Sequence, residues 1–400
     1  MNNPDGFRVL CGPADPALAA AAPPLPPFAP QAVEFLAALS AALLKDPSAR
    51  AYPEVVSFAF FCRRANLQAM RASYDDLSLR LGRGLAFHIA PGNVPMNFAY
   101  SLVSALLAGN ASIVKAPSKA FAQVAVTCAA MQTLLREGFQ PLLPYASVIE
   151  YSRDRQDLTA HFSALCDVRI LWGGDDTIRR VRRAELNPRA FDVPFADRWS
   201  LAVLNADAVL RMDNAALTAL AVGFYNDTYL YDQNACTAPR LCVWLGEPQA
   251  LETAKSKFWN AVHREAAARY QLSALTAVDK QTELFRAAVL LDGARQEPAG
   301  DMLLQRIHVD ALTPECMNIH CTGGCFLEYD AAGLAELLPV LTPRTQTLAC
   351  AGLDTNEVRS FLLSAGAKGV DRVVPVGHTL DFSLVWDGYD LIRTLSRKLI

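Results

Sequence analysis

A cysteine that could act as a nucleophile stands in the segment QNACTAPR, Gln233 to Arg240. Cys236 follows an aromatic run, Phe224 to Tyr231, and its small, turn-prone neighbours would leave a thiol within reach of a substrate. The thiolate is the reactive form, and backbone N–H groups or a nearby positive charge such as Arg240 favour it. A structural role is the alternative, since the chain has ten cysteines. The segment therefore makes Cys236 a candidate nucleophile, and other segments of the chain must supply further evidence for this role.

An amide side chain that could stabilise an oxyanion lies in FHIAPGNVP, Phe87 to Pro95. This segment has the pattern of a strand that ends in a turn, and the turn opens a helix. Ligands in α/β proteins bind at the carboxyl ends of parallel strands, where Asn93 could donate a hydrogen bond to a developing oxyanion. The alternative for Asn93 is to cap the helix or to hold an unusual backbone angle.

Two further strand ends carry groups that suit a nucleotide. SIVKAPS places Lys115 and Ser118 where an adenosine ribose and its phosphate would fit, and a solvated lysine is the alternative. LWGGDDT follows another predicted strand, and its Gly173 and Gly174 would let the backbone approach a pyrophosphate. No suitably placed GxGxxG occurs, so the ordinary dinucleotide fingerprint is missing.

A competing cluster, ECMNIHCTGGC, spans Glu315 to Cys325. Cys316, His320, Cys321 and Cys325 offer enough ligand atoms for a tetrahedral zinc ion. Adjacent ligands at 320 and 321 are sterically awkward, and the paired CxxC knuckles of common structural sites are missing. The apolar neighbours favour a strand and a turn instead. We therefore predict no metal site and keep a zinc-organised, non-catalytic scaffold as an alternative.

The elements that must position these residues alternate between strand and helix. Strands are predicted at 84–90, 111–115, 147–151 and 168–172, and helices at 96–108 and 120–137. This order indicates an α/β fold with a parallel sheet covered on both faces. Before it, the proline-rich segment 23–30 predicts an arm, and helices are predicted at 31–44 and 55–74. A second α/β region runs from about 200 to 370.

The composition limits the class of protein. The 400 residues are 52% hydrophobic and 19% charged, which is typical of a globular chain of two or three domains. Lys and Arg number 37 against 40 Asp and Glu, so the basic excess of a nucleic-acid binder is absent. Scattered cysteines and an amino terminus without a secretory pattern predict reduced thiols in the cytoplasm. The uncharged stretch 95–114 predicts a helix, a turn and a strand rather than a membrane span.

Five segments together resemble one family. PGNVP, GNASIVKAPSK, WGGDD, QNACTAPR and WDGYDLIRTLSR occur in this order between about Leu81 and Arg397, and they resemble the LuxC-type acyl-CoA reductases of the aldehyde dehydrogenase superfamily. The resemblance implies an α/β, aldehyde-dehydrogenase-like fold with a Rossmann-type cofactor domain, an α/β catalytic domain and a small oligomerisation element. We expect an amino-terminal arm at 1–30, the cofactor domain at 31–198 and the catalytic domain at 199–372. The segment 373–400 would return to the cofactor domain or form an oligomer interface.

The resemblance also implies a role for each candidate residue. Cys236 matches the nucleophile, and Asn93 matches the amide that holds the oxyanion. The matches to cofactor-binding positions are Lys115 and Ser118 at the adenosine ribose, and Gly173, Gly174 and Asp175 in the cofactor turn. Asp175 stands where many superfamily members have serine.

One departure from the superfamily favours reduction over hydrolysis. Hydrolytic aldehyde dehydrogenases have a glutamate base just before the segment that resembles DRWSLAVLNADA, and Phe195 stands there in this chain. Hydrolysis of an acyl-cysteine needs a base to activate water, whereas reduction needs a hydride donor and a dry site. We therefore expect an acyl-CoA, with a long acyl chain, to be reduced to the aldehyde through acyl-Cys236. Acyl transfer by Cys236 without redox chemistry is the alternative.

The resemblance further indicates the cofactor and the partners. Many relatives that use NAD have a glutamate where Ser118 stands. A neutral serine beside Lys115 and Lys119 would instead donate a hydrogen bond to a 2′-phosphate whose charge the two lysines offset. We therefore predict NADPH as the cofactor. The expected partners are the acyl-CoA substrate and a second copy of the chain, with an acyl-activating or acyl-transferring protein as a candidate. Neither nucleic acid nor a membrane span is expected.

Overall fold

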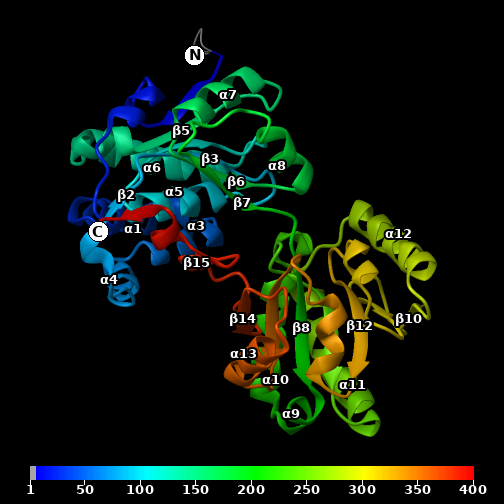
Figure 1. The fold of residues 1–400 in the computed structure, drawn as a ribbon. Helices are drawn as coiled ribbons and strands as arrows, with labels where there is room; N and C mark the ends of the chain where they lie inside the picture. Colours follow the sequence, from blue (N-terminus) through cyan, green and yellow to red (C-terminus); the bar gives the residue numbers. More distant parts are fainter. Residues whose placement is uncertain (1–5) are drawn as a thin grey trace. The chain divides into compact units, whose positions relative to one another are not determined.

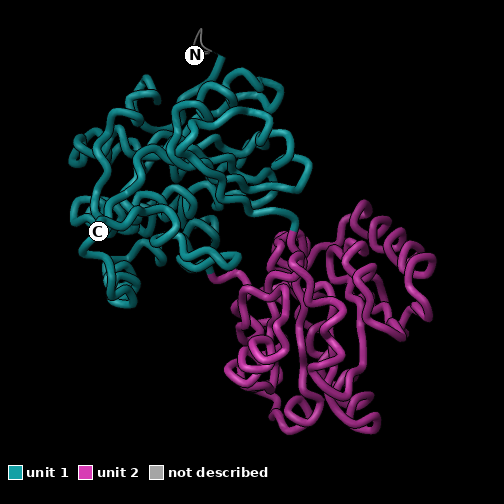
Figure 2. Tube along the Cα trace, in the orientation of Figure 1, with its two compact units in different colours: residues 1–197, 382–400 teal, residues 198–381 magenta. Residues whose placement is uncertain are grey.

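The computed structural model describes residues 6–400, and the chain divides into two compact units (Figure 2). Unit 1 comprises the chain up to Asp197 together with Phe382–Ile400, and unit 2 comprises Arg198–Asp381. Each unit has its own sheet (Figure 1), with one buried hydrophobic cluster in unit 1 and two in unit 2 among the described residues.

Unit 1 is built on a six-stranded sheet with the strand order β1-β5-β4-β3-β6-β7. These strands are β1 (Arg8–Cys11), β3 (Leu85–Ile89), β4 (Ala111–Lys115), β5 (Ala146–Glu150), β6 (Val168–Trp172) and β7 (Phe191–Phe195). Neighbouring strands are parallel, except that β1 runs antiparallel to β5. Every residue of β3, β4 and β6 is buried, as expected for parallel strands covered on both faces.

The predicted helices of unit 1 are largely confirmed. The helices are α1 (Pro30–Lys45), α2 (Pro47–Arg50), α3 (Pro53–Phe61), α4 (Arg64–Ala72), α5 (Asn97–Leu107), α6 (Ala122–Glu137), α7 (Gln156–Leu165) and α8 (Asp175–Val181). The prediction of one helix over 55–74 is wrong, because Arg63 adopts an extended conformation with ψ of 138°. Asn66 then donates a hydrogen bond to the carbonyl of Phe61, 2.8 Å away, at the end of α3.

The uncharged stretch 95–114 forms α5, a turn and the start of β4, as predicted. At this turn Gly109 has a φ of 94°, a conformation that suits glycine. The buried Asn110 side chain accepts a hydrogen bond from the N–H of Arg83, at 2.7 Å, and donates to the carbonyls of Ala105 and Leu395. Within residues 6–400, no helix combines the length and apolar character that a bilayer crossing requires.

The amino-terminal arm packs on unit 1. Its strand β1 adds an edge to the sheet through β5. In the proline-rich segment, the N–H of Leu25 donates to the carbonyl of Gly109 at 2.8 Å, and the hydroxyl of Tyr145 donates to the carbonyl of Pro23 at 2.6 Å. These long-range contacts fix the arm before α1 begins.

Unit 2 contains a seven-stranded sheet with the order β10-β11-β12-β9-β8-β13-β14, parallel except at β10. The strands are β8 (Trp199–Asn205), β9 (Pro239–Leu245), β10 (Arg295–Gln296), β11 (Gln305–His308), β12 (Cys325–Ala331), β13 (Thr345–Ala351) and β14 (Arg372–Pro375). The helices are α9 (Ala206–Arg211), α10 (Asn214–Thr228), α11 (Pro248–Arg269), α12 (Ala274–Leu290) and α13 (Thr355–Ala365).

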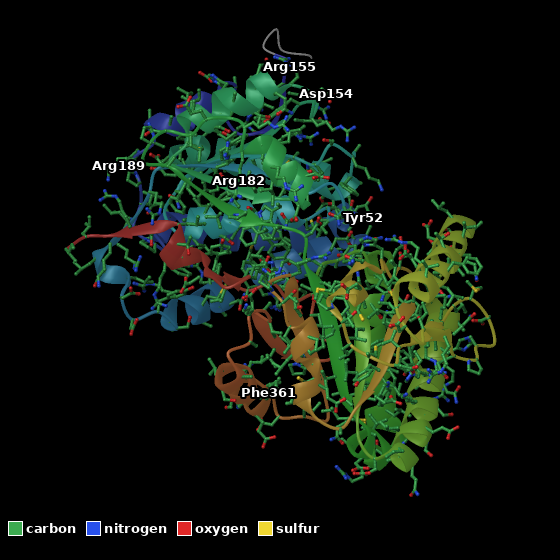
Figure 3. All side chains as sticks on the ribbon, turned by 45° about the vertical axis from the view of Figure 1, so that its right-hand side comes forward. Tyr52, Asp154, Arg155, Arg182, Arg189 and Phe361 are labelled. Atoms are coloured by element: carbon green, nitrogen blue, oxygen red, sulfur yellow. The ribbon has the colours of Figure 1, made fainter. Side chains whose placement is uncertain are left out.

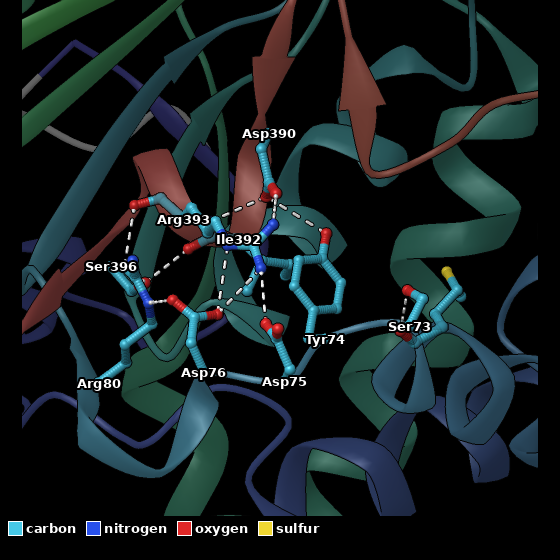
Figure 4. Close-up of polar contacts among 10 residues, drawn as sticks. Ser73, Tyr74, Asp75, Asp76, Arg80, Asp390, Ile392, Arg393 and Ser396 are labelled. Carbon is cyan, nitrogen blue, oxygen red and sulfur yellow. Dashed lines mark hydrogen bonds and ion pairs between the residues drawn. The ribbon is translucent and has the colours of Figure 1, made fainter.

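The carboxyl-terminal segment belongs to unit 1. It forms β15 (Val385–Trp386), β16 (Tyr389–Asp390), α14 (Leu391–Thr394) and β17 (Ser396–Lys398), and β17 pairs antiparallel with β2 (Arg80–Gly82). Figure 4 shows the polar contacts that accompany this pairing. The guanidinium of Arg393 contacts the carboxylates of Asp75 and Asp76, each at 3.1 Å, and the hydroxyl of Tyr74 donates to Asp390 at 3.2 Å.

Candidate active site

Cys236 lies in unit 2, in the loop that leads into β9. It is half-buried, whereas the other nine cysteines are buried. Burial raises the pKa of buried thiols such as Cys166 and Cys350 to about 12, so these thiols stay protonated at neutral pH. Cys236 is therefore the most accessible of the ten thiols.

The backbone just before Cys236 forms a left-handed turn. Tyr231, Asp232 and Gln233 have φ values of 58°, 53° and 61°, which are uncommon for residues other than glycine. Such conformations cost on the order of 1 to 3 kcal/mol each and persist where the surrounding structure enforces them. Contacts must therefore hold this turn in place.

Gln233 supplies those contacts with both ends of its buried amide. Its Nε2 donates to the carbonyls of Pro239, at 2.8 Å, and Cys325, at 2.9 Å. Its Oε1 accepts from the N–H groups of Gly324, at 3.0 Å, and Cys325, at 3.3 Å. The side chain thus joins the cysteine loop to the starts of β9 and β12. The sequence contained no signal for the contacts with Gly324 and Cys325, because these partners are 91 and 92 residues away.

Ser200, at the start of β8, fixes the backbone carbonyl of Cys236. Its Oγ donates to the carbonyl of Cys236 at 2.7 Å and accepts from the N–H of Thr347 at 3.2 Å. Ser200 is fully buried, and Thr237 beside the cysteine is 2% exposed. The loop therefore presents the thiol from a backbone held on both sides.

A buried lysine supports the same region from α12. The ammonium of Lys280 donates to the carbonyls of Gly323, at 2.9 Å, and Gly324, at 3.3 Å, and reaches Met302 and Leu303 as well. Burial lowers the pKa of Lys280 to about 8. Gly324 is bound by both side chains: its carbonyl accepts from Lys280, and its N–H donates to Gln233. Lys280 and Gln233 therefore support the same segment.

The cysteine and histidine cluster at 316–325 lies in this supporting structure. Cys316, Cys321 and Cys325 are buried, whereas His320 is exposed. Cys325 opens β12, as the strand and turn interpretation predicted. Within the part of the chain that the structure describes, no group of three or more His, Cys, Asp or Glu residues is arranged to hold a metal ion.

In unit 1, Asn93 is exposed in the loop that joins β3 to α5. Lys115 is the last residue of β4 and is 6% exposed, and its Nζ lies 3.4 Å from the hydroxyl of Ser118 and 5.1 Å from the ring centroid of Tyr151. Burial lowers the pKa of Lys115, and the positive charge of Arg180 acts in the same direction. Sequence reasoning placed Lys115 and Ser118 together, and the structure brings them within reach of each other.

Arg180 is a residue that sequence reasoning missed. It lies in α8, and its charge is close enough to influence Lys115. Its Nε is buried without a hydrogen-bond partner in residues 6–400. A buried guanidinium nitrogen without an acceptor is unfavourable, and an anionic oxygen would satisfy it. This donor, together with Lys115 and Ser118, forms a group of polar and cationic side chains that suits an anion.

The turn between β6 and α8 contains Gly173 and Gly174, as predicted. The N–H of Asp175 donates to the carboxylate of Asp197 at 3.2 Å, and the N–H of Asp197 lies 3.4 Å from a carboxylate oxygen of Asp175. Asp175 also lies 3.6 Å from Arg179. The first N–H of α8 is therefore bound by Asp197, a contact that the sequence did not reveal.

A polar network lies beneath this turn, inside the sheet of unit 1. The indole N–H of Trp172 donates to the hydroxyl of Ser101 at 2.9 Å, and the ring of the fully buried His88 contacts Ser101 at 2.7 Å and Ser112 at 3.3 Å. Burial lowers the pKa of His88 to about 3, so the ring is neutral near pH 7. The indole also stacks on the ring of Phe195.

An ion pair fixes the strands that carry Trp172 and Phe195. Arg169, in β6, is 1% exposed and binds Asp192 of β7 at 2.7 Å. Arg182, which Figure 3 labels, contacts the same carboxylate at 3.0 Å. Arg169 also donates to the carbonyl of Val181 at the end of α8, so one buried cation holds both strands and the helix.

The fold is aldehyde-dehydrogenase-like. A NAD-dependent benzaldehyde dehydrogenase from Corynebacterium glutamicum aligns with 96% of this chain and 85% of its own, at 16% identity and a TM-score of 0.59. A 1-pyrroline-5-carboxylate dehydrogenase from Thermus thermophilus aligns with 97% of this chain and 85% of its own, at 14% identity and a TM-score of 0.63. At these identities the likeness shows the fold alone, and it confirms the predicted fold class.

The family model described as acyl-CoA reductase (LuxC) matches residues 53–398, so the chain belongs to the LuxC family. A curated relative, the long-chain acyl-protein thioester reductase of Photobacterium phosphoreum, is 28% identical over 169 residues. That match covers 41% of this chain and 32% of the relative, about a third of its length. The predicted family is confirmed.

Proposed function

We propose that this chain reduces a long-chain acyl thioester to the aldehyde through an acyl group on Cys236. The observation that carries the proposal is one accessible thiol on a rigidly held loop, and the family resemblance adds that the aromatic residue Phe195 stands where hydrolytic relatives have their base. The thiol can form an acyl-enzyme, and Phe195 has no atom that could accept a proton from water.

The reaction begins when the thiolate of Cys236 attacks the thioester carbonyl. A carbon–sulfur bond forms, and the carbonyl electrons move to oxygen, where the family resemblance assigns Asn93 as a hydrogen-bond donor. Collapse of this oxyanion expels the thiol of the donor as a thiolate, which takes up a proton. Ser200 and Gln233 keep the backbone of the nucleophile in one position throughout.

A reduced nicotinamide, when bound, would supply a hydride to the acyl carbon. The resulting thiohemiacetal on Cys236 collapses, which releases the aldehyde and restores the thiolate. Phe195, which the family resemblance places where hydrolytic relatives have their base, is 4% exposed, stacks on Trp172 and cannot activate water. The acyl-cysteine would therefore persist until it is reduced.

We propose NADPH as the hydride donor. Ser118 places a neutral hydroxyl beside the ammonium of Lys115, and the unsatisfied Nε of Arg180 adds a second cationic donor to the same region. These groups would hold a 2′-phosphate through charge-assisted hydrogen bonds. We propose that the pyrophosphate approaches the backbone at Gly173 and Gly174. The carboxylate of Asp175 lies 3.6 Å from the guanidinium of Arg179, which offsets its negative charge.

The acyl donor is proposed to be a thioester of CoA or of a partner protein. The family model is described as an acyl-CoA reductase, and the curated relative is named an acyl-protein thioester reductase. Both donors present the same carbonyl to Cys236. An assay that supplies each donor separately distinguishes them.

The test is to mix the protein with acyl-CoA substrates of graded chain length and NADPH, and to follow the absorbance of the reduced nicotinamide together with the aldehyde formed. Wild-type protein should consume NADPH and release one aldehyde for each, and Asn93→Ala should slow this by on the order of 10²-fold. Cys236→Ala should abolish it, with Cys321→Ala as the control for a buried thiol. Acyl transfer to another thiol without any binding of NADPH would select the alternative, a cysteine acyltransferase.

A further inference from the structure

Four basic side chains gather at the edge of the unit 2 sheet where its parallel strands begin. Arg240 is the second residue of β9, Arg344 directly precedes β13, His320 lies in the loop before β12, and Arg286 lies on α12. We call these four side chains the basic cluster. Because β8, β9, β12 and β13 run parallel, their starts share one edge of the sheet. The same edge carries Cys236, in the loop before β9.

Two arginines of the basic cluster converge on one residue of the loop before β12. Nη2 of Arg286 donates to the backbone carbonyl of Asn318 at 3.2 Å, and Nη1 of Arg344 lies 3.4 Å from the side-chain oxygen of Asn318. Nη2 of Arg344 also lies 3.5 Å from the carbonyl of Met317. Both arginines are exposed. Two guanidinium groups are thus held together, two residues before His320.

A β-bulge positions Arg240. Ser200 of β8 pairs with Pro239 of β9, and Leu201 pairs with Leu241, so Arg240 is the extra residue between the two pairs. A bulge interrupts the alternation of side chains along a strand, and bulges are frequent beside active sites, where they redirect a side chain. The hydroxyl of Ser200 also holds the cysteine loop. Arg240 therefore stands next to the loop that carries the candidate nucleophile.

Positive charge exceeds negative charge in the basic cluster. Burial lowers the pKa of His320, and the three arginines lower it further, so the ring is neutral near pH 7. All three guanidinium groups are therefore close enough to act on one ring. Glu283 opposes them: its carboxylate accepts from Arg286 at 2.9 Å and from the N–H of His320 at 2.8 Å. One carboxylate among three guanidinium groups leaves an excess of positive charge.

The chemistry of these side chains suits phosphate. Guanidinium groups bind phosphate oxygens through charge-assisted hydrogen bonds, often two at a time, and a neutral imidazole can donate one more. Of the two acyl donors considered above, CoA carries a diphosphate and a ribose phosphate far from its thioester. A thioester on a cysteine of a partner protein carries neither. Phosphate binding at this edge of the sheet therefore favours CoA as the donor.

We propose that the basic cluster binds the phosphate groups of acyl-CoA while the thioester lies at Cys236. This inference rests on the proposed function, because it concerns the donor of the same acyl group. Contacts with a remote part of the donor stabilise its complex with the protein before any bond is made or broken. The basic cluster is thus a site that selects the donor, and it takes no part in the chemical steps.

Acyl-pantetheine tests the proposal, because it has the same thioester and no phosphate. Acylation of the full-length protein without nicotinamide is followed by intact mass, and the half-saturating concentration of each thioester is measured. For wild-type protein this concentration should be about tenfold lower, or less, with acyl-CoA than with acyl-pantetheine. Arg344→Gln should largely remove this preference, and Arg344→Lys should retain most of it.

Arg295→Gln is the matched control, because Arg295 is an exposed arginine of unit 2 that lies on β10, outside the basic cluster. It should keep the preference for acyl-CoA. Equal half-saturating concentrations of the two thioesters in wild-type protein would overturn the proposal. An equal loss of preference in Arg295→Gln and Arg344→Gln would do the same.

A thioether analogue of acyl-CoA tests binding apart from the reaction, because it cannot acylate Cys236. Calorimetry should give a dissociation constant about tenfold higher for Arg344→Gln than for wild-type protein, and a still higher one for Arg286→Gln with Arg344→Gln. Circular dichroism checks that both variants fold. Thioether binding that neither variant weakens would overturn the proposal, even if Cys236 is acylated. Binding that both variants weaken, in a protein that no thioester acylates, would support the basic cluster and contradict the proposed function.

Discussion

The ring of Phe195 lies flat against the indole of Trp172, with centroids 3.7 Å apart and planes inclined by 11°. The two residues end neighbouring parallel strands, and the N–H of Gly173 donates to the carbonyl of Phe195 at 3.2 Å. The indole is also held by Ser101. Phe195 is therefore part of a stacked, apolar pair at the ends of β6 and β7.

Phe195→Glu should redirect the acyl-enzyme from reduction to hydrolysis. The carboxylate would restore a base that can activate water, so free fatty acid should appear at the expense of aldehyde. Phe195→Leu is the matched control, because it removes the stacking without adding a base. Chromatography of the products from acyl-CoA and NADPH measures both. Equal acid from the Glu and Leu variants would show that Phe195 does not occupy the position of the base.

Ser118→Glu should weaken the binding of NADPH far more than that of NADH. The added carboxylate would repel a 2′-phosphate and could accept hydrogen bonds from ribose hydroxyls. Arg180→Gln should act in the same direction without adding a negative charge, because it removes a cationic donor beside Lys115. Fluorescence titration of both cofactors measures these effects. Equal losses for the two cofactors would remove Ser118 and Arg180 from the 2′-phosphate site.

Gln233→Glu should lower the rate of acyl-enzyme formation while cofactor binding stays unchanged. A carboxylate has no N–H for the carbonyls of Pro239 and Cys325, so two buried acceptors lose their donor. We expect a loss of about 1 to 3 kcal/mol in the free energy of unfolding. Gln132→Glu, a side chain bonded to Gly12 in unit 1, controls for the same change of atoms elsewhere. An unchanged acylation rate in Gln233→Glu would show that the turn is held by other contacts.

His88 should make the protein sensitive to mild acid. Its pKa is about 3 in the folded chain, below the ordinary 6.5, so the unfolded chain binds a proton first as the pH falls. The stability that the neutral ring contributes is therefore present above pH 6.5 and is lost as the pH falls toward about 3. In His88→Gln this part of the pH dependence should disappear. Denaturant unfolding from pH 7 to pH 4 measures it, and parallel curves for the two proteins would contradict the assignment.

Local sequence patterns predicted much of the fold. Apolar runs bounded by turn residues predicted the strands found as β4 and β6, and β1 was missed because its four residues lie in the arm. The break between α3 and α4 was also missed, because it depends on the backbone of Arg63 and on the side chain of Asn66.

The candidate site was less predictable, because its supports come from distant parts of the chain. QNACTAPR drew attention to Cys236, but the role of Gln233 depends on the register of β9 and β12. The hydrogen bond from the N–H of Asp175, at the start of α8, to the carboxylate of Asp197 likewise joins residues that are 22 positions apart in the sequence. Residue type and spacing can therefore point to a candidate nucleophile, whereas the residues that hold its loop are found only in the folded chain.

The most direct test of the central claim is a chase of the isolated acyl-enzyme. Protein mixed with acyl-CoA in the absence of nicotinamide should gain the mass of one acyl group, located on the peptide that contains Cys236. After removal of excess acyl-CoA, addition of NADPH should return the protein to its original mass and release one aldehyde for each acyl group lost. Release of fatty acid instead of aldehyde, or an acyl group that forms equally on Cys236→Ala, would contradict the account.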